Sequence, residues 1–279
     1  TGVLTCALPI SHANFSLFLK SKDRRVRKDA FEGLYSVYEQ YRNTFASTLY
    51  GGVKSEIFYA KMRKYESALQ GSLFNDDISV DVYENLIKSV SENIPALDKY
   101  IDLKKKFLGL DEIHMYDLYV PVIEVPKEHV EFDKAVEMAV EGLNPLGKEY
   151  LDIFQGGING GWIDKYINKG KRGGAYSWGG YDTKPYVLLN YTGTNFDVSS
   201  IAHEFGHAMH SYYSDKNQNV LEHSYTLLLA EIASTVNEIL LAQYRLKNST
   251  DKQEKIALLY DRIETVKSTL FTQAMFAEF

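Results

Sequence analysis

Two histidines and a glutamate near residue 205 have the side-chain types and the spacing that metal-dependent hydrolysis requires. They form the pattern His203-Glu204-x-x-His207. Residues four apart lie on one face of an α-helix, so both imidazoles can bind the same ion. The residue after the first histidine lies about a quarter turn away, where a carboxylate can take a proton from a water molecule beside the metal. The pattern therefore predicts a zinc-protease site with Glu204 as the general base.

The residues around this motif predict a capped and half-buried helix. Asp197 is the preferred N-cap among the polar residues 195–200, because an oxygen there can accept a hydrogen bond from a free first-turn N–H group. Four apolar side chains then recur at helical spacing and are expected to face the core, namely Ile201, Phe205, Ala208 and Met209.

A third histidine, His210, lies on the same predicted face seven residues after His203. Two helical turns separate these residues by roughly 10 Å, whereas zinc–nitrogen bonds are about 2 Å long. One ion cannot bind both side chains. We expect His210 to line the cleft or to support the ligands.

A catalytic zinc site needs a third protein ligand. A third histidine six residues after the second would require glycine at position 210 and histidine at position 213. The chain has His210 and Tyr213 there, so that class of site is excluded. The better candidate is Glu231, on a second predicted helix.

The predicted second helix has an apolar stripe and a separate polar face. Glu231, Ser234 and Glu238 share the polar face, and the stripe consists of Leu228, Ile232, Val236, Ile239 and Leu240. Burying a carboxylate in such a helix costs free energy unless a charge compensates it, and a divalent cation would do so. The alternative is that Glu231 and Glu238 form a solvated stripe.

These motifs resemble those of a known family. The run His203 to His210, followed by Glu231-Ile232-Ala233-Ser234, resembles the M3 family of zinc peptidases, which includes thimet oligopeptidase-like enzymes and the oligoendopeptidase F group. The segments Ala230 to Glu238 and Lys171 to Ser177 are similar to oligoendopeptidase F in particular. The resemblance extends from about Lys22 to Phe279.

The resemblance implies a site and a substrate class. One zinc ion per chain would be held by His203, His207 and Glu231, with Glu204 as the base, and Glu238 and His210 would orient the ligands. The implied activity is that of an endopeptidase acting on short unfolded oligopeptides. The implied fold is a mostly helical, zincin-type catalytic domain with a small sheet beside the metal helix.

Composition limits the class of protein. The chain has 279 residues, 45% of them hydrophobic and 24% charged, with a net charge of −6, which predicts one large globular domain or two small ones. The mild acidity argues against nucleic acid as a partner, and no apolar run approaches membrane-spanning length. A single cysteine and no recognisable secretory signal favour a reducing, cytoplasmic location. The oligomeric state is left open.

The two ends of the chain differ from the rest. Residues 1–13 show no clear periodicity, and Ala7-Leu8-Pro9-Ile10 is what a sequencing-adaptor stretch would encode, so we hypothesise that this leader is foreign to the fold. Ala277-Glu278-Phe279 stops within a helical pattern. The expectation is a partial catalytic domain over residues 14–279, truncated at its C-terminal end.

Apolar periodicity predicts helices over most of the chain. The basic run 20–28 is expected to be the exposed face of a first helix, which Gly51-Gly52 breaks, and Met115 to Val125 is expected to be an extended connector. The other predicted helices cover Ser55–Leu69, Asp77–Asn93, Ile94–Phe107, Phe132–Leu143 and Leu146–Phe154, and Ser249-Thr250-Asp251 caps one more.

The glycine-rich segment Gly156–Gly193 contains two short predicted strands, Ala175–Trp178 and Tyr186–Tyr191. We expect a small sheet beside the metal helix, whose free edge can pair with an extended peptide, with glycines allowing close approach. Gly174, Ala175 and Tyr176 are the candidate cleft residues. The alternative is an ordinary glycine-rich hairpin.

Two other functions stay open. A carboxypeptidase or dipeptidase could use the same metal site with a different cleft. A structural zinc site, or an inactive helical binding module, would need no base. Structural sites are normally closed by four protein ligands, and His223 is the only spare histidine nearby.

Overall fold

The computed structural model describes residues 12–123 and 129–279, and most of them are helical. Two compact units are distinguished by their internal contacts: Thr1–Glu124 together with Arg262–Phe279, and Val125–Asp261. The prediction of a mostly helical chain with one small sheet is confirmed. The leader hypothesis concerns residues 1–13, of which 1–11 lie outside the described part.

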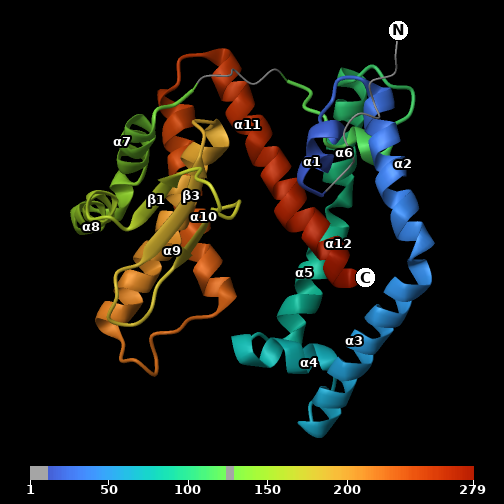
Figure 1. Ribbon diagram of the computed structural model, residues 1–279, viewed down its shortest axis with the longest axis horizontal. Helices are drawn as coiled ribbons and strands as arrows, with labels where there is room; N and C mark the ends of the chain where they lie inside the picture. The colour runs from blue at the N-terminus through green and yellow to red at the C-terminus, as the bar shows by residue number, and fades with distance from the viewer. Residues whose placement is uncertain (1–11, 124–128) are drawn as a thin grey trace. The chain divides into compact units, whose positions relative to one another are not determined.

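The described residues of the first unit form helices joined by turns and loops, with no strand among them (Figure 1). Its helices are α1 His12–Leu19, α2 Arg24–Gln40, α3 Arg42–Met62, α4 Ala68–Leu73, α5 Val80–Glu92, α6 Ile94–Phe107 and α12 Thr272–Glu278, with short turns η2 Phe74–Asp76 and η3 Met115–Asp117 and a π-helical segment η5 Lys267–Phe271.

Two predictions about this unit are wrong. Gly51-Gly52 does not end a helix, because α3 continues through both glycines to Met62. A glycine costs only about 1 kcal/mol in a helix interior, which a 21-residue helix tolerates. The break lies instead at Tyr41, between the end of α2 and the start of α3. The N–H of Tyr41 donates to the carbonyl groups of Tyr38 and Glu39.

The predicted extended connector at Met115 to Val125 is also absent from its described residues. Met115–Asp117 forms the short turn η3. Asp117 is fully buried there and accepts hydrogen bonds from Arg24 and Arg27 of α2. This ion-paired aspartate holds the segment in a turn, which apolar pattern alone does not indicate. Residues 124 and 125 lie outside the described part.

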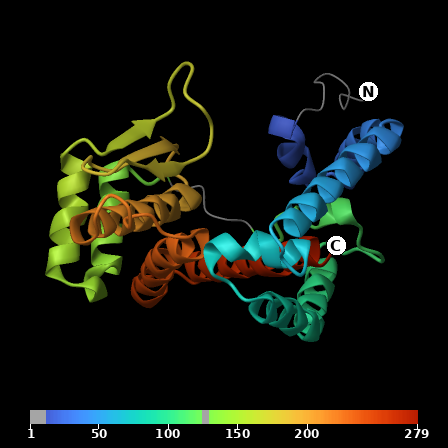
Figure 2. The ribbon, with the colours of Figure 1, turned by 90° about the horizontal axis from the view of Figure 1, so that it is seen from below.

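The second unit places a three-stranded sheet against helices (Figure 2). Its elements are α7 Phe132–Gly142, η4 Asn144–Leu146, α8 Lys148–Asn159, β1 Ile163–Tyr166, β2 Tyr176–Trp178, β3 Tyr186–Tyr191, α9 Asn195–Asn217 and α10 Leu227–Asn248; α11 Lys252–Val266 begins there. The strand order is β1-β3-β2, with β1 parallel and β2 antiparallel to β3.

The core of the second unit surrounds α9. The four predicted apolar residues of this helix, Ile201, Phe205, Ala208 and Met209, are all buried. On the sheet, alternate residues of β3 face the same core, because side chains of a strand alternate between its two faces. These residues are Val187, Leu189 and Tyr191. The sheet and the core thereby fix the orientation of α9.

The predicted N-cap of α9 is wrong by three residues. Thr194 is the N-cap, and its hydroxyl accepts a hydrogen bond from the Asp197 N–H at 3.2 Å. The Asp197 carboxylate accepts the N–H of Thr194 at 2.9 Å and that of Thr192 at 3.0 Å. Asp197 is therefore the acidic third residue of a capping box, and the helix begins earlier than predicted.

Among the described helices, none has the length and apolarity needed to cross a membrane.

Candidate metal centre

Helix α9 presents His203 and His207 side by side. Their Nε2 atoms are 3.2 Å apart, and both side chains are partly buried. This is the geometry expected of residues one turn apart on a single helix face. Two imidazole nitrogens this close can also bind one metal ion together.

Helix α10 crosses α9 at Gly206, between the two histidines. A Cβ at Gly206 would lie 2.6 Å from the Ser234 Cα and 2.8 Å from the Ala233 carbonyl oxygen. Only glycine allows the two backbones to approach so closely. Figure 1 shows the two helices side by side. The glycine inside the motif could have indicated a close backbone contact from the sequence alone. It does not indicate which segment of the chain makes that contact.

The crossing brings Glu231 of α10 to the two imidazoles. Its Oε2 atom lies 3.7 Å from the Nε2 of His203 and 3.7 Å from that of His207. The side chain of Glu231 is 47% exposed, so the cost of burial predicted for it does not apply, and its position alone makes it a candidate. The structure thus brings the three predicted ligands together, while their binding of a metal stays a prediction.

The three side chains fit a zinc ion. Two ligands of a tetrahedral zinc with bonds near 2.0–2.1 Å lie about 3.3 Å apart, close to the observed 3.2 and 3.7 Å. All three ligand atoms lie within 4.8 Å of one another. Two imidazoles and one carboxylate are one of the donor sets of catalytic zinc sites, which keep the fourth position open.

A carboxylate and a hydroxyl of α10 contact two of the three candidate ligands. Glu238 lies 2.5 Å from the Nδ1 atom of His203, as predicted for a residue that orients a ligand. This hydrogen bond is the main cause that raises the pKa of His203. An Nδ1–H that donates to Glu238 leaves Nε2 as the atom that can bind a metal. Ser234 is fully buried and donates to the Glu231 Oε2 at 2.9 Å, which sequence reasoning missed.

Glu204 is buried beside the cluster, with 7% of its surface exposed. Burial raises its pKa to about 6, the charge of His203 opposes this shift, and the charges of Glu231 and Glu238 add to it. Burial also lowers the pKa of His207, which favours the neutral imidazole that a metal requires. A carboxylate with a pKa near neutrality is suited to accept and return a proton.

A buried amide fixes α9 from the other side, and sequence reasoning also missed it. Asn237 of α10 is 1% exposed and donates to the Ala202 carbonyl of α9 at 3.0 Å. It also hydrogen-bonds to the hydroxyl of Tyr150 at 2.9 Å. Because Ala202 directly precedes His203, this hydrogen bond fixes the position of the two histidines along the axis of α10.

The other two nearby histidines lie outside the ligand cluster of the described residues. His210 stacks on Tyr225, with ring centres 3.7 Å apart, and burial lowers the pKa of His210. Tyr225 in turn lies 2.5 Å from the hydroxyl of Ser211. His223 pairs with Asp215 at 2.7 Å. The structure gives no support to His223 as a fourth ligand of a structural zinc site.

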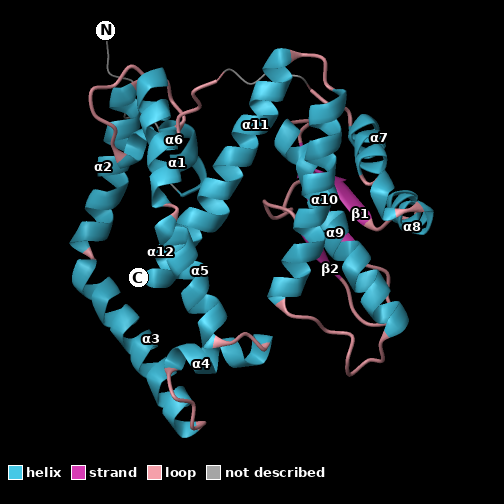
Figure 3. Ribbon diagram, turned by 180° about the vertical axis from the view of Figure 1, so that it is seen from behind, coloured by secondary structure: helices cyan, strands magenta, loops and turns pink. Residues whose placement is uncertain are grey.

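The predicted cleft residues begin the outer strand of the sheet. Gly174, with φ of +91°, and the exposed Ala175 lead into β2 at Tyr176. Within the described residues β2 pairs only with β3, so its outer edge is free. Strand β2 also lies beside α9 (Figure 3). The two predicted strands are confirmed, and their role as a cleft stays a prediction.

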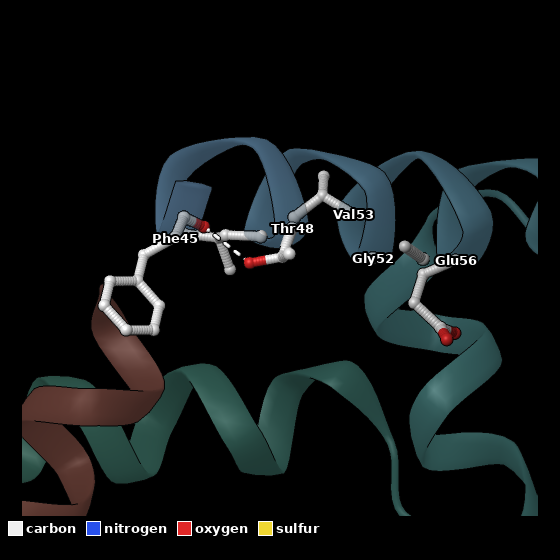
Figure 4. A pocket seen from close by; sticks show the side chains of 7 residues that line it. Phe45, Thr48, Gly52, Val53 and Glu56 are labelled. Carbon is white, nitrogen blue, oxygen red and sulfur yellow. Dashed lines mark hydrogen bonds between the residues drawn. The ribbon is translucent and has the colours of Figure 1, made fainter. Parts of the chain in front are cut away.

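A separate groove in the first unit has a different character. It has a volume of about 700 Å³ and is lined almost entirely by apolar atoms of α3 and by Ala68. Figure 4 shows Phe45, Thr48, Val53 and Glu56 around it. Among the described residues that line it, Glu56 alone is ionisable, so this groove lacks the chemical groups found at the α9–α10 crossing.

Comparison with known proteins decides the family. Residues 17–279 match the family model for "Peptidase family M3". The chain belongs to peptidase family M3. The resemblance seen in the motifs is therefore confirmed over nearly the whole chain, and the metal-site candidates of this M3 chain lie in the part that the family model covers.

The M3 chain is similar to several bacterial proteins. It is 45% identical to oligopeptidase PepF of Bacillus subtilis, over 97% of this chain and 40% of that protein. It is 40% identical to group B oligopeptidase PepB of Streptococcus agalactiae, over 97% of this chain and 45% of that protein. The chain spans less than half the length of these relatives.

Solved structures agree with this assignment. A Chlamydophila abortus protein described as a peptidase superposes with a TM-score of 0.87 at 46% identity, covering 97% of this chain and 45% of that one. Oligoendopeptidase F from Enterococcus faecium superposes with a TM-score of 0.71 at 35% identity, covering 97% and 41%. The fold of the M3 chain is thus that of oligoendopeptidase F structures.

Proposed function

We propose that this chain carries the zinc site of an oligoendopeptidase, a cytoplasmic enzyme that hydrolyses internal peptide bonds of short unfolded oligopeptides. The observation that carries the proposal is the meeting of His203, His207 and Glu231 within 4.8 Å. Family membership and the names of the relatives support it.

In this proposal His203, His207 and Glu231 hold one zinc ion. When bound, zinc would supply a Lewis acid that polarises the scissile carbonyl and makes a water molecule more acidic. Glu204 takes the proton of the attacking water and passes it to the leaving amine. Its raised pKa of about 6 suits both steps, because the group is ionised at neutral pH and still readily protonated.

The free edge of β2 binds the substrate in this proposal. An extended peptide can add to an exposed strand edge through main-chain hydrogen bonds, and such bonds do not depend on the side chains of the peptide. Because β2 lies beside α9, a peptide on this edge would run past the metal helix. A segment that must be extended to bind would be unfolded, as the proposed oligopeptide substrates are.

The decisive variant is Glu204→Gln, which keeps the size of the side chain and removes its basicity. Zinc content should stay near one per chain, while cleavage of an internally quenched oligopeptide falls by about 100-fold or more, the usual contribution of a general base. Glu222→Gln, at an exposed glutamate of the same unit, is the control. Hydrolysis retained by Glu204→Gln would refute the assignment.

Product analysis separates the endopeptidase from its alternatives. Cleavage in the middle of the quenched peptide supports an oligoendopeptidase. Release of single residues or dipeptides from one end would indicate a carboxypeptidase or dipeptidase. Zinc binding with no cleavage by the full-length protein would favour a structural site.

A further inference from the structure

The loop 218–226, which joins α9 to α10, folds back onto the last turn of α9. Most residues of this loop are exposed, but His223 and Tyr225 are partly buried. The Nδ1 atom of His223 lies 2.7 Å from a carboxylate oxygen of Asp215, and these side chains are 26% and 19% exposed. The hydroxyl of Ser214 donates to the His223 carbonyl at 2.5 Å. The side chain and the backbone of His223 are thus both bound to α9.

Aromatic rings extend this attachment in two directions. The ring of Tyr225 stacks on His210 of α9 with centres 3.7 Å apart, and its hydroxyl lies 2.5 Å from that of Ser211. From the segment between β2 and β3, Tyr181 packs edge-on against His223 with ring centres 5.1 Å apart. The end of the loop that enters α10 is therefore held against one face of α9.

The first turn of α10, which leads to Glu231, is weakly packed. Its three leucines at 227–229 are between 48% and 69% exposed. Thr226 is the N-cap, but its side chain makes no capping hydrogen bond. Among the described residues of α10, burial begins only at Ser234. Apolar packing therefore fixes α10 from Ser234 onward and leaves the position of the turn before it to other contacts.

Two contacts within the crossing reach this turn. Ser234 restricts the side chain of Glu231 through a hydrogen bond at 2.9 Å, and His207 hydrogen-bonds to the backbone of Ala230. Neither contact sets the path by which the backbone enters α10. That path is set by the loop, which is bound to α9 two and four residues before α10 begins at Leu227.

We propose that His223 and Tyr225 are positioning residues for the metal site. By binding the loop 218–226 to α9, they fix the start of α10 and thereby the place of Glu231 opposite the two histidines of α9. A ligand that is already in place binds an ion more tightly, because less order is lost on binding. The inference rests on the proposed function, since it takes Glu231 as a zinc ligand, and it gives His223 a role other than that of a ligand.

The first test replaces His223 in the full-length protein that carries this chain. His223→Ala should weaken zinc binding by about tenfold, as expected if the binding-competent arrangement is populated about one tenth of the time. His223→Asn should restore most of the affinity, because its amide can still donate to Asp215. The measurement is competition with a chelator of known affinity. Equal losses in the two variants would refute the role of this hydrogen bond.

The control removes another histidine of the same unit. His129 is 60% exposed and pairs with Glu131 at 3.2 Å. His129→Ala should leave zinc affinity unchanged, because neither residue contacts α9 or α10 in this way. A tenfold loss in His129→Ala would show that the effect is not specific to the loop and would overturn the inference.

The second test asks whether the loop acts through Glu231. Glu231→Ala alone should weaken zinc binding, and adding His223→Ala to it should weaken binding no further, because the ligand that the loop positions is already gone. Such non-additivity is the signature of two residues that act together. Equal losses in both backgrounds would overturn the inference.

A milder variant guards against loss of the fold. Tyr225→Phe keeps the ring on His210 and removes the hydroxyl contact with Ser211. Zinc affinity should fall by about twofold to tenfold, the range for one hydrogen bond, and amide hydrogen exchange should become faster over residues 218–231 but not over 237–245. Faster exchange with wild-type zinc affinity would make the loop merely structural and would refute the inference.

The outcomes distinguish the inference from the proposed function. A wild-type protein that binds no zinc refutes the proposed function and, with it, this inference. A wild-type protein that binds zinc, with affinity unchanged in His223→Ala, refutes only the inference.

Discussion

Glu238 is the residue on which the orientation of His203 depends. The two side chains are 2.5 Å apart, and Ser234 holds Glu231 in a similar way at 2.9 Å. The candidate ligands His203 and Glu231 thus each have a side-chain partner on α10 that restricts their rotation. His207 instead hydrogen-bonds to the backbone of Ala230.

Replacing Glu238 tests this support directly. In Glu238→Gln, His203 loses the carboxylate that fixes its tautomer, and zinc affinity should fall by about 10–100-fold. The measurement is a titration against a chelator of known affinity, with Glu222→Gln as the control. Unchanged affinity would show that the hydrogen bond has no role in metal binding.

At the scale of elements, the site depends on one helix crossing. The backbones of α9 and α10 meet where Gly206 lies against Ala233 and Ser234, and Asn237 ties the same helices at Ala202. These contacts set the distance between the two histidines and Glu231. Any side chain at position 206 must move one helix away from the other.

Gly206→Ala should therefore damage both stability and the site. Forcing a methyl group into this contact should lower the free energy of unfolding by about 1–3 kcal/mol, and zinc affinity should fall as Glu231 moves away. Urea unfolding and metal titration measure the two effects. Gly156→Ala, in open space on α8, should show neither, and wild-type behaviour of Gly206→Ala would contradict the crossing.

The sequence predicted those parts of the fold that depend on interactions between residues close together in the chain. The spacing of Ile201, Phe205, Ala208 and Met209 indicated the buried face of α9, because a helix has only one face for such a pattern. The strands that begin at Tyr176 and Tyr186 were predicted from short runs of strand-forming residues between glycine-rich turns. The pairing of His203 with His207 also needed only the helical period.

The wrong predictions concern features that depend on contacts between residues far apart in the sequence. The start of α9 depended on which of several polar residues caps it, and Thr194 with Asp197 as partner replaced the predicted cap. On α10 the pattern did not show which face meets α9: Leu228 and Ile232 are 53% and 51% exposed, whereas Asn237 is buried. The partner of Gly206 could not be identified for the same reason.

At the scale of the whole molecule, the first unit has its own charged anchor. Asp117 is fully buried and pairs with Arg27 at 2.7 Å and Arg24 at 3.0 Å. Burial alone would raise the pKa of Asp117, but the hydrogen bonds from the two arginines outweigh it and lower the pKa below its usual value. The ionised form is therefore favoured in the folded chain.

Asp117→Asn should destabilise the chain by about 3–5 kcal/mol at neutral pH, since it leaves the buried Arg27 guanidinium without a countercharge. A folded pKa below the unfolded one gives stability that is present above pH about 4 and is lost as the pH falls through the folded value. The difference between wild type and variant should shrink in that acidic range. Urea unfolding at several pH values measures it, and a difference independent of pH would contradict this account.

All of the candidate ligands come from α9 and α10, within the second unit. The site can therefore be tested without reference to the first unit. The most direct measurement is anomalous diffraction at the zinc edge from crystals of zinc-loaded protein. The account predicts one peak within about 2.3 Å of His203 Nε2, His207 Nε2 and a Glu231 oxygen, with no fourth protein ligand. A peak elsewhere, or one that excludes Glu231 or includes His223, would contradict it.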